Sequence, residues 1–236
     1  MMKLKLKKKV SNPTIIEGFP GFGLVGTIAT EYLLEHLDCE LIGKYWFEEL
    51  PATIAIHAGE VVHPIGIFYN KKYNLVIVHA ILTTANIEWK VADLIEYIAD
   101  QTKAKEIICL EGVGSTGMET DEPKTFYFTT DPKKEKVIAK FSDKLKEGII
   151  VGGTSALLLK SSRPITTFFA DTHSSLPDSK AAAKLIEILD KYLGLKIDPK
   201  PLLETAKRFE DKLKGILEQG GKAQEDMKKK QMSYVG

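Results

Sequence analysis

Short runs of apolar and β-branched residues alternate along the chain with longer segments whose apolar positions recur every three or four residues. Strands are expected at residues 14–17, 40–47, 105–110, 125–130 and 165–171, because strands covered on both faces of a sheet are apolar throughout. Apolar positions three and four residues apart share one face of a helix. Helices are expected at residues 24–37, 87–98, 133–146 and 178–193, with Asn86 and Asp178 as N-caps.

Residues 53–82 carry three further strand signals, at 53–58, 61–69 and 75–82, separated by short turns. Strands joined by such turns pair antiparallel, whereas strands separated by helices pair parallel. Leu4 and Leu6, placed between lysines, predict an additional edge strand. The order of elements therefore predicts an α/β fold, a three-layer α/β/α sandwich around a mixed sheet.

The chain changes character near Gly194, and three parts are expected: a core domain (1–195), a C-terminal helix (196–220) and a flexible tail (221–236). Asp198 followed by Pro199 is a helix-start signal. The apolar positions of the helix form a seam with heptad spacing at Leu202, Ala206, Phe209, Leu213 and Ile216. Two heptads are too few for an isolated coiled coil, so the seam must pack on the domain or on another subunit.

Charge and composition exclude several classes of protein. The chain has 236 residues with 33 Lys and Arg against 32 Asp and Glu, which disfavours a nucleic-acid-binding protein. The start of the chain lacks the apolar run of a signal peptide, and no uncharged window approaches the ~18 residues of a membrane span. Cys39 and Cys109 cannot form a disulfide framework, so we expect a reduced, cytoplasmic protein without nucleic-acid or membrane partners.

One glycine-rich turn follows the first strand and opens the first helix, at Gly18, Pro20, Gly21, Gly23 and Gly26. Its last three glycines have the spacing of a dinucleotide-binding turn. The acidic residues after the next strand do not stand where such a site holds its ribose-binding carboxylate. We therefore favour a structural turn that packs the helix tightly on the sheet.

Other motifs give weaker signals for chemistry. A second glycine-rich loop, residues 112–117, lies after a strand, where Glu111 could face a ligand. Asp171 and His173 suggest part of a triad, but no G-x-S-x-G nucleophile motif is present. His57, His63 and His79 match no metal-binding spacing. We predict no catalytic residue, no metal and no cofactor.

The last five residues have the chemistry of a docking unit. Tyr234 lies close to the terminal carboxylate of Gly236, with Met232 and Val235 as apolar neighbours. A lysine or a backbone pocket can take such a carboxylate while a groove takes the ring.

The run Gly18-Phe19-Pro20-Gly21-Phe22-Gly23-Leu24-Val25-Gly26 resembles the N-terminal signature of the proteasome assembly chaperone 2 family. So do the later Glu111-Gly112-x-Gly114 loop, the run 148–153 and Ala156-Leu157-Leu158, and the resemblance covers residues 14–193. It implies a fold similar to nucleoside phosphorylases without their catalysis, a homo-oligomer, by analogy a tetramer, and binding to the α-ring of the proteasome core.

In that family docking uses a C-terminal hydrophobic-Tyr-any signature, in which the tyrosine inserts between α subunits and the carboxylate pairs with a lysine. Here Tyr234 is third from the end and follows Ser233, which departs from the signature.

Three hypotheses for the function follow. The first is a non-enzymatic assembly chaperone or ATP-independent activator that docks through its tail. The second is an enzyme or binding protein for a small molecule, nucleotide or nucleoside, which uses the two glycine-rich loops. A third hypothesis is a scaffold that self-associates through the heptad seam.

Overall fold

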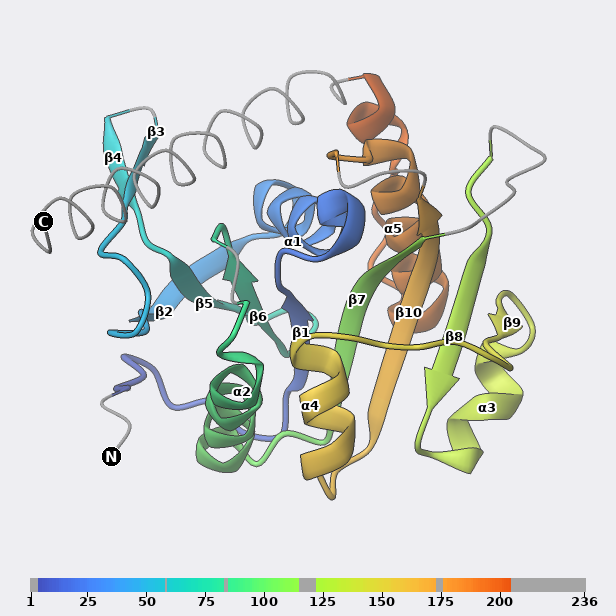
Figure 1. Ribbon diagram of the computed structural model, residues 1–236, viewed down its shortest axis with the longest axis horizontal. Coiled ribbons are helices and arrows are strands. Elements are labelled where there is room, and N and C mark those ends of the chain that lie inside the picture. The colour runs from blue at the N-terminus through green and yellow to red at the C-terminus, as the bar shows by residue number, and fades with distance from the viewer. Residues whose placement is uncertain (1–3, 58, 83–84, 115–121, 173–175, 205–236) are drawn as a thin grey trace, which may run out of the picture.

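The computed structural model describes residues 4–57, 59–82, 85–114, 122–172 and 176–204. The strands are β1 (Thr14–Gly18), β2 (Cys39–Tyr45), β3 (Ala55–His57), β4 (Glu60–Val62), β5 (Ile65–Asn70), β6 (Leu75–Ala80), β7 (Glu106–Gly114), β8 (Thr125–Thr129), β9 (Asp143–Lys144) and β10 (Ile165–Thr172). Within these described ranges, eight strands form one sheet in the order β2-β5-β6-β1-β7-β10-β8-β9, and β3 pairs with β4 in a separate small sheet (Figure 1).

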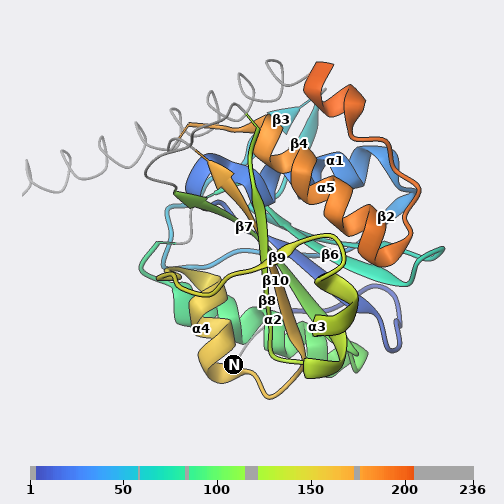
Figure 2. The same cartoon turned by 90° about the vertical axis from the view of Figure 1, so that its right-hand side faces the viewer.

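Helices cover both faces of the large sheet. They are η1 (Phe22–Leu24), α1 (Val25–His36), α2 (Glu88–Thr102), α3 (Pro132–Ile138), α4 (Gly153–Lys160) and α5 (Ser179–Leu193). Figure 2 shows α1 and α5 on one side of the sheet and α2 and α4 on the other. Because neighbouring residues of a strand face opposite ways, Ile16 packs in the core under α1 and α5, and Ile15 packs in the core under α2 and α4. The predicted three-layer sandwich is confirmed.

The sheet is mixed, as predicted. The central strands β6, β1, β7 and β10 run parallel, with Ile16 of β1 between Ile77 of β6 and Ile108 of β7. The outer pairs β2–β5, β5–β6 and β10–β8 run antiparallel. The carboxyl ends of the central strands therefore meet at one edge of the sheet.

Two strand predictions were wrong. Residues 4–10 form no strand: the N–H of Lys7 donates to the carbonyl of Ile42 at 2.7 Å, but Leu4 and Val10 turn into the core under α2. The expected strand at 61–69 is two strands, β4 and β5, that belong to different sheets. Pro64 stands between them and has no N–H with which to continue a ladder.

Two helix predictions also need correction. Asn86 has a left-handed φ of 69°, and Ile87 is the N-cap of α2 instead. The lysine-rich helix at 133–146 ends at Ile138, since the chain then returns to pair Asp143 with Phe126 of β8. Pairing with a distant strand overrides the local helical preference there.

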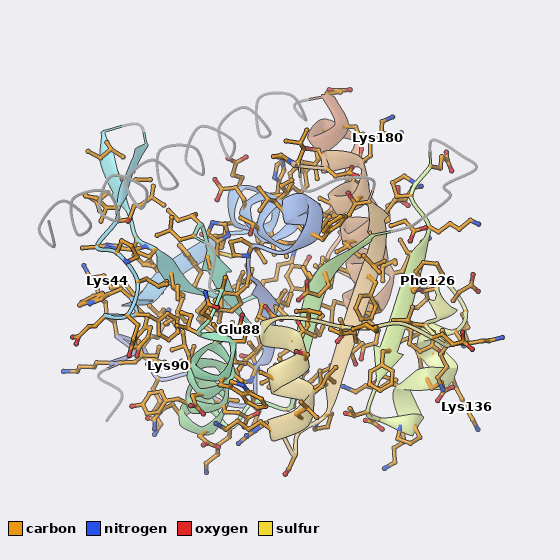
Figure 3. The ribbon with its side chains drawn as sticks, in the orientation of Figure 1. Lys44, Glu88, Lys90, Phe126, Lys136 and Lys180 are labelled. Carbon is orange, nitrogen blue, oxygen red and sulfur yellow. The ribbon has the colours of Figure 1, made fainter. Side chains whose placement is uncertain are left out.

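Lysine side chains lie at several separate places on the outline of the molecule. Figure 3 shows Lys44, Lys136 and Lys180 on different sides of it. No helix of the described segments is long and apolar enough to cross a membrane. Because Lys44, Lys136 and Lys180 lie apart, these three lysines do not form one basic face.

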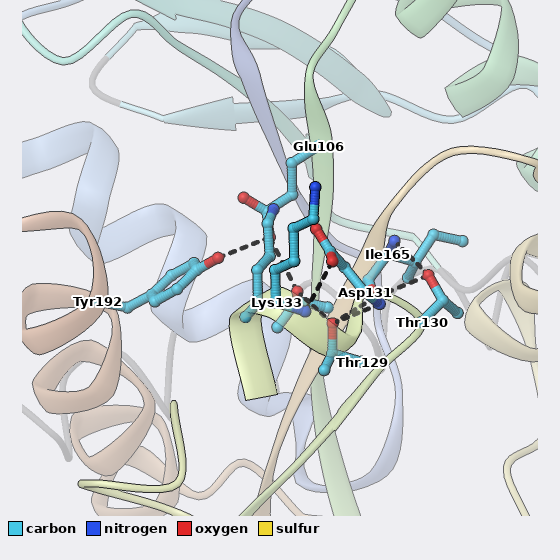
Figure 4. A network of polar contacts seen from close by, with 9 residues as sticks. Glu106, Thr129, Thr130, Asp131, Lys133, Ile165 and Tyr192 are labelled. Carbon is cyan, nitrogen blue, oxygen red and sulfur yellow. Dashed lines mark hydrogen bonds and ion pairs between the residues drawn. The ribbon is translucent and has the colours of Figure 1, made fainter. Parts of the chain in front are cut away.

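A buried polar network ties helices to the sheet at the amino end of β7. Glu106 is 4% exposed, and its Oε1 accepts hydrogen bonds from the hydroxyls of Thr166 (2.8 Å) and Tyr192 (2.9 Å). The ammonium of Lys134 lies 2.5 Å from the same oxygen. Figure 4 shows the hydroxyl of Tyr192 pointing toward Glu106. Because the carboxylate has charged and neutral donors, the network joins α3 and α5 to β7 and β10 without an uncompensated buried charge.

Candidate functional site at the carboxyl ends of β1 and β7

The glycine-rich turn brings α1 against the sheet at unusually short range. A Cβ on Gly26 would lie 2.3 Å from the carbonyl oxygen of Leu110 in β7, and one on Gly18 would lie 2.3 Å from the carbonyl oxygen of Gly26. Gly23 has a φ of +64°, and a Cβ there would lie 2.6 Å from the hydroxyl of Thr172. The backbone of the turn is thus in contact with β7 and β10.

Acidic side chains stand where a dinucleotide would need positive charge. A Cβ on Gly21 would lie 2.9 Å from Oε2 of Glu111. On the other side of the turn, the N–H of Asp178 donates to the carbonyl of Gly23 at 2.9 Å, and the Asp178 carboxylate accepts from Thr172 at 2.8 Å. The carboxylate of Asp178 beside the turn disfavours a pyrophosphate there.

Glu17 and Glu111 come together on the face of the sheet that α4 covers. They belong to adjacent parallel strands, in which Glu17 pairs in register with Cys109, two residues before Glu111. Thr154, in the first turn of α4, places its Oγ1 3.0 Å from Oε1 of Glu17 and 2.5 Å from Oε1 of Glu111. One hydroxyl therefore bridges two carboxyl groups.

The environment of this pair favours the neutral carboxylic acid. Glu17 is 3% exposed, and burial raises its pKa despite hydrogen bonds from Cys109 and Thr154. Burial, followed by the negative charge of Glu17, raises the pKa of Glu111 to about 8. The pair consequently holds a proton at neutral pH. The described residues contain no group of three His, Cys, Asp or Glu side chains that could hold a metal ion.

The two cysteines are free thiols. Burial, then the charge of Glu17, raises the pKa of Cys109 well above its ordinary value, and burial raises that of Cys39 to about 11. Thiolates are the nucleophiles in cysteine chemistry, so both side chains behave as inert core groups near neutral pH.

Sequence reasoning missed an apolar groove of about 680 Å³ beside this edge. The segment 46–54 and the residues around Pro64 and Leu82 line it. Next to the groove, the β3–β4 hairpin exposes Ile56 (72%) and Val61 (50%). Alternating apolar residues in this hairpin were the available signal, but they also fit an ordinary half-buried strand.

Several predicted site residues lie outside the described ranges. These are His173 of the suggested triad, the seam residues Ala206, Phe209, Leu213 and Ile216, and the tail residues Met232, Tyr234, Val235 and Gly236. Asp171 is buried at the end of β10. His79 is buried between Thr30 and Glu31, which lie 2.9 and 3.0 Å from its ring nitrogens.

The start of the C-terminal helix is described and anchored. Residues 200–204 are helical, and Asp198 accepts a hydrogen bond from the N–H of Lys200 at 3.0 Å. The hydroxyl of Tyr32 in α1 donates to the carbonyl of Asp198 at 2.7 Å. Leu202, the first residue of the predicted seam, is fully buried in the core under α1 and α5.

Comparison with known proteins shows which family the chain belongs to. The model of the PAC2 family matches residues 15–217. A crystal structure of Pyrococcus furiosus PbaA, an archaeal homolog of proteasome-assembly chaperone, is 30% identical and superposes with a TM-score of 0.83, over 94% of this chain and 99% of that one. An uncharacterized protein of Methanocaldococcus jannaschii, MJ0106, is 25% identical over 98% of this chain and 96% of its own length.

Pyrococcus furiosus PbaB, described as an archaeal proteasome activator, shares the fold. Its TM-score is 0.75 at 22% identity, over 91% of this chain and 98% of that one.

Proposed function

We propose, from the premise that this chain belongs to the PAC2 family, that it is a non-enzymatic protein that binds the proteasome core particle. The observation that carries the proposal is the likeness to PbaA, which extends over 94% of the chain at 30% identity. The chain is accordingly similar to archaeal homologues of proteasome assembly chaperones. We place its action in the cytoplasm.

The docking element in this proposal is the C-terminal tail. Tyr234 is the anchor that enters a groove of the α-ring, the carboxylate of Gly236 pairs with a lysine, and Met232 and Val235 supply apolar contacts. The burial of Leu202 and the hydrogen bond from Tyr32 to Asp198 support it, because they fix the position of residues 198–202, to which the C-terminal segment is joined.

A pull-down with purified archaeal proteasome core tests this mechanism. The full chain should bind, and a chain ending at Gln231 should not. Tyr234→Ala should weaken binding, while the matched variant Ser233→Ala should bind normally. Unchanged binding by the truncated chain would contradict tail docking. A peptide-hydrolysis assay on the same complexes then distinguishes an activator, which accelerates hydrolysis, from an assembly factor, which does not.

We further propose that the chain acts as a homo-oligomer, with a tetramer as the expected state. Several tails on one assembly bind multivalently, so each contact can be weak. Phe209→Glu with Leu213→Glu in the predicted seam should lower the mass measured by light scattering if the seam joins subunits. An unchanged mass would assign the seam to packing on its own domain.

A small-molecule ligand is the second candidate function. The observation in its favour is the apolar groove of about 680 Å³, a volume typical of ligand sites, at the sheet edge where α/β proteins bind ligands. A thermal-shift screen with nucleosides and nucleotides tests it, since a ligand at a hundred times its Kd stabilises the fold by ~2.7 kcal/mol. If no compound raises the melting temperature, the result would count against this second function and would not affect the proteasome proposal.

A further inference from the structure

Thr154 has a single hydroxyl proton but lies within hydrogen-bonding distance of two carboxyl oxygens, Oε1 of Glu17 and Oε1 of Glu111. The hydroxyl can donate to one of them only. If both carboxyl groups were ionised, the second contact would set lone pairs against each other in a site that is buried at Glu17 and half-buried at Glu111. A second proton, carried by one of the carboxyl groups, satisfies both contacts at once.

We propose that Glu17, Glu111 and Thr154 form a proton-binding site that locks α4 to the ends of β1 and β7, and that loss of this proton releases α4. The lock is a property of the isolated chain and is independent of how the chain meets the proteasome. No group in the proposed docking mechanism takes part in it.

The surroundings offer this pair no compensating cation among the described residues. The titratable group in contact with it is the thiol of Cys109. On β10, Asp171 lies on the same face of the sheet. It pairs in register with Val113 of β7, which is two residues after Glu111. On the opposite face, His79 points toward α1.

The charged residues of the packed helices are engaged elsewhere. On α2, Asp93 pairs with Lys160 at the far end of α4, Glu96 pairs with Arg163, and Lys90 pairs with Glu49. Ionisation of the second carboxyl group therefore adds a half-buried negative charge at Glu111 that no side chain of the described neighbouring residues neutralises. Separation of α4 from the strands completes the hydration of this charge.

Ala156 and Leu157 of α4 pack in the core under α2, but the start of the helix has no side-chain cap. Its N-cap, Gly152, has a φ of +107° and makes no side-chain cap hydrogen bond. Just before it, Ile149 and Val151 are 91% and 80% exposed. Release of α4 therefore also changes how this apolar segment is presented on the surface.

Two measurements on the full chain test the site between about pH 5 and pH 9. In ¹³C NMR of glutamate-labelled protein, a carboxyl signal should titrate with a pKa of about 8, the value to which burial and Glu17 raise Glu111. Amide exchange in the peptide covering residues 145–160, corrected for intrinsic rates, should rise about tenfold for each pH unit above the transition.

Glu111→Gln supplies a permanently neutral group of the same shape, so its α4 amides should stay protected at pH 9. Glu60→Gln, an exposed position in β4, is the matched control and should follow the wild type. Carboxyl signals that all titrate below pH 6, α4 protection that does not depend on pH, or a Glu111→Gln profile equal to that of the wild type would each overturn the proposal. The NMR titration of the wild type decides alone if the variant does not fold.

Discussion

Gly26 lies so close to Leu110 that a Cβ on the glycine would stand 2.3 Å from the carbonyl oxygen of the leucine. The first turn of α1 therefore rests directly on the backbone of β7. This contact places the glycine-rich turn, and with it the strand ends that carry Glu17 and Glu111, in one compact corner of the fold.

Gly26→Ala should destabilise the protein by roughly 1–3 kcal/mol or more, because neither α1 nor the backbone of β7 can move away from the added methyl group cheaply. Urea unfolding followed by circular dichroism measures the change. Gly148→Ala is the control: its new Cβ would meet Leu145 at an ordinary 3.4 Å, and stability should be unchanged. Equal stability of the two variants would contradict the tight contact.

Stability should fall as the pH rises from about 4.5 to about 8. Burial and the charge of Glu17 raise the pKa of Glu111 from 4.5 to about 8 in the folded chain. In this range the folded state binds the proton and the unfolded state has already lost it, so each increase in pH favours unfolding. Thermal unfolding at several pH values should show the slope in the wild type and a shallower slope in Glu111→Gln.

The polar network around Glu106 should contribute more to the free energy of unfolding than exposed polar contacts do. Tyr192→Phe removes one hydrogen bond to a buried carboxylate and should cost about 1.5–3 kcal/mol. Lys134→Met leaves the carboxylate without its cation and should cost about 3–5 kcal/mol. Lys133→Met, at the exposed neighbouring position, should be close to neutral in the same urea titration.

The neighbouring residues Leu202 and Leu203 should differ sharply when replaced by alanine. Leu202 is fully buried in the core under α1 and α5, so Leu202→Ala should cost about 2–5 kcal/mol of unfolding free energy. Leu203 is 46% exposed, and Leu203→Ala should have little effect. Equal losses in denaturant titrations would show that the helix start does not pack as described.

The sequence by itself determined the type and order of most elements. Apolar runs and helical spacing are local signals, so β1, β7, β10 and α5 could be located from them, and Asp178 was correctly expected to cap α5, where its side chain accepts from the N–H of Ala181. The glycine spacing at 18–26, together with the later glycine motifs, was specific enough to indicate the family, because close backbone contacts of this kind tolerate few residues.

Only the tertiary structure decided which residues share a site. Glu17, Glu111 and Thr154 are separated by 94 and 43 positions in the sequence (111 − 17 and 154 − 111), and none belongs to a motif with the others. Their meeting depends on β1 and β7 being parallel neighbours and on α4 covering that face. The raised pKa values follow from the same placement, since desolvation depends on what surrounds a carboxyl group and not on its neighbours in the chain.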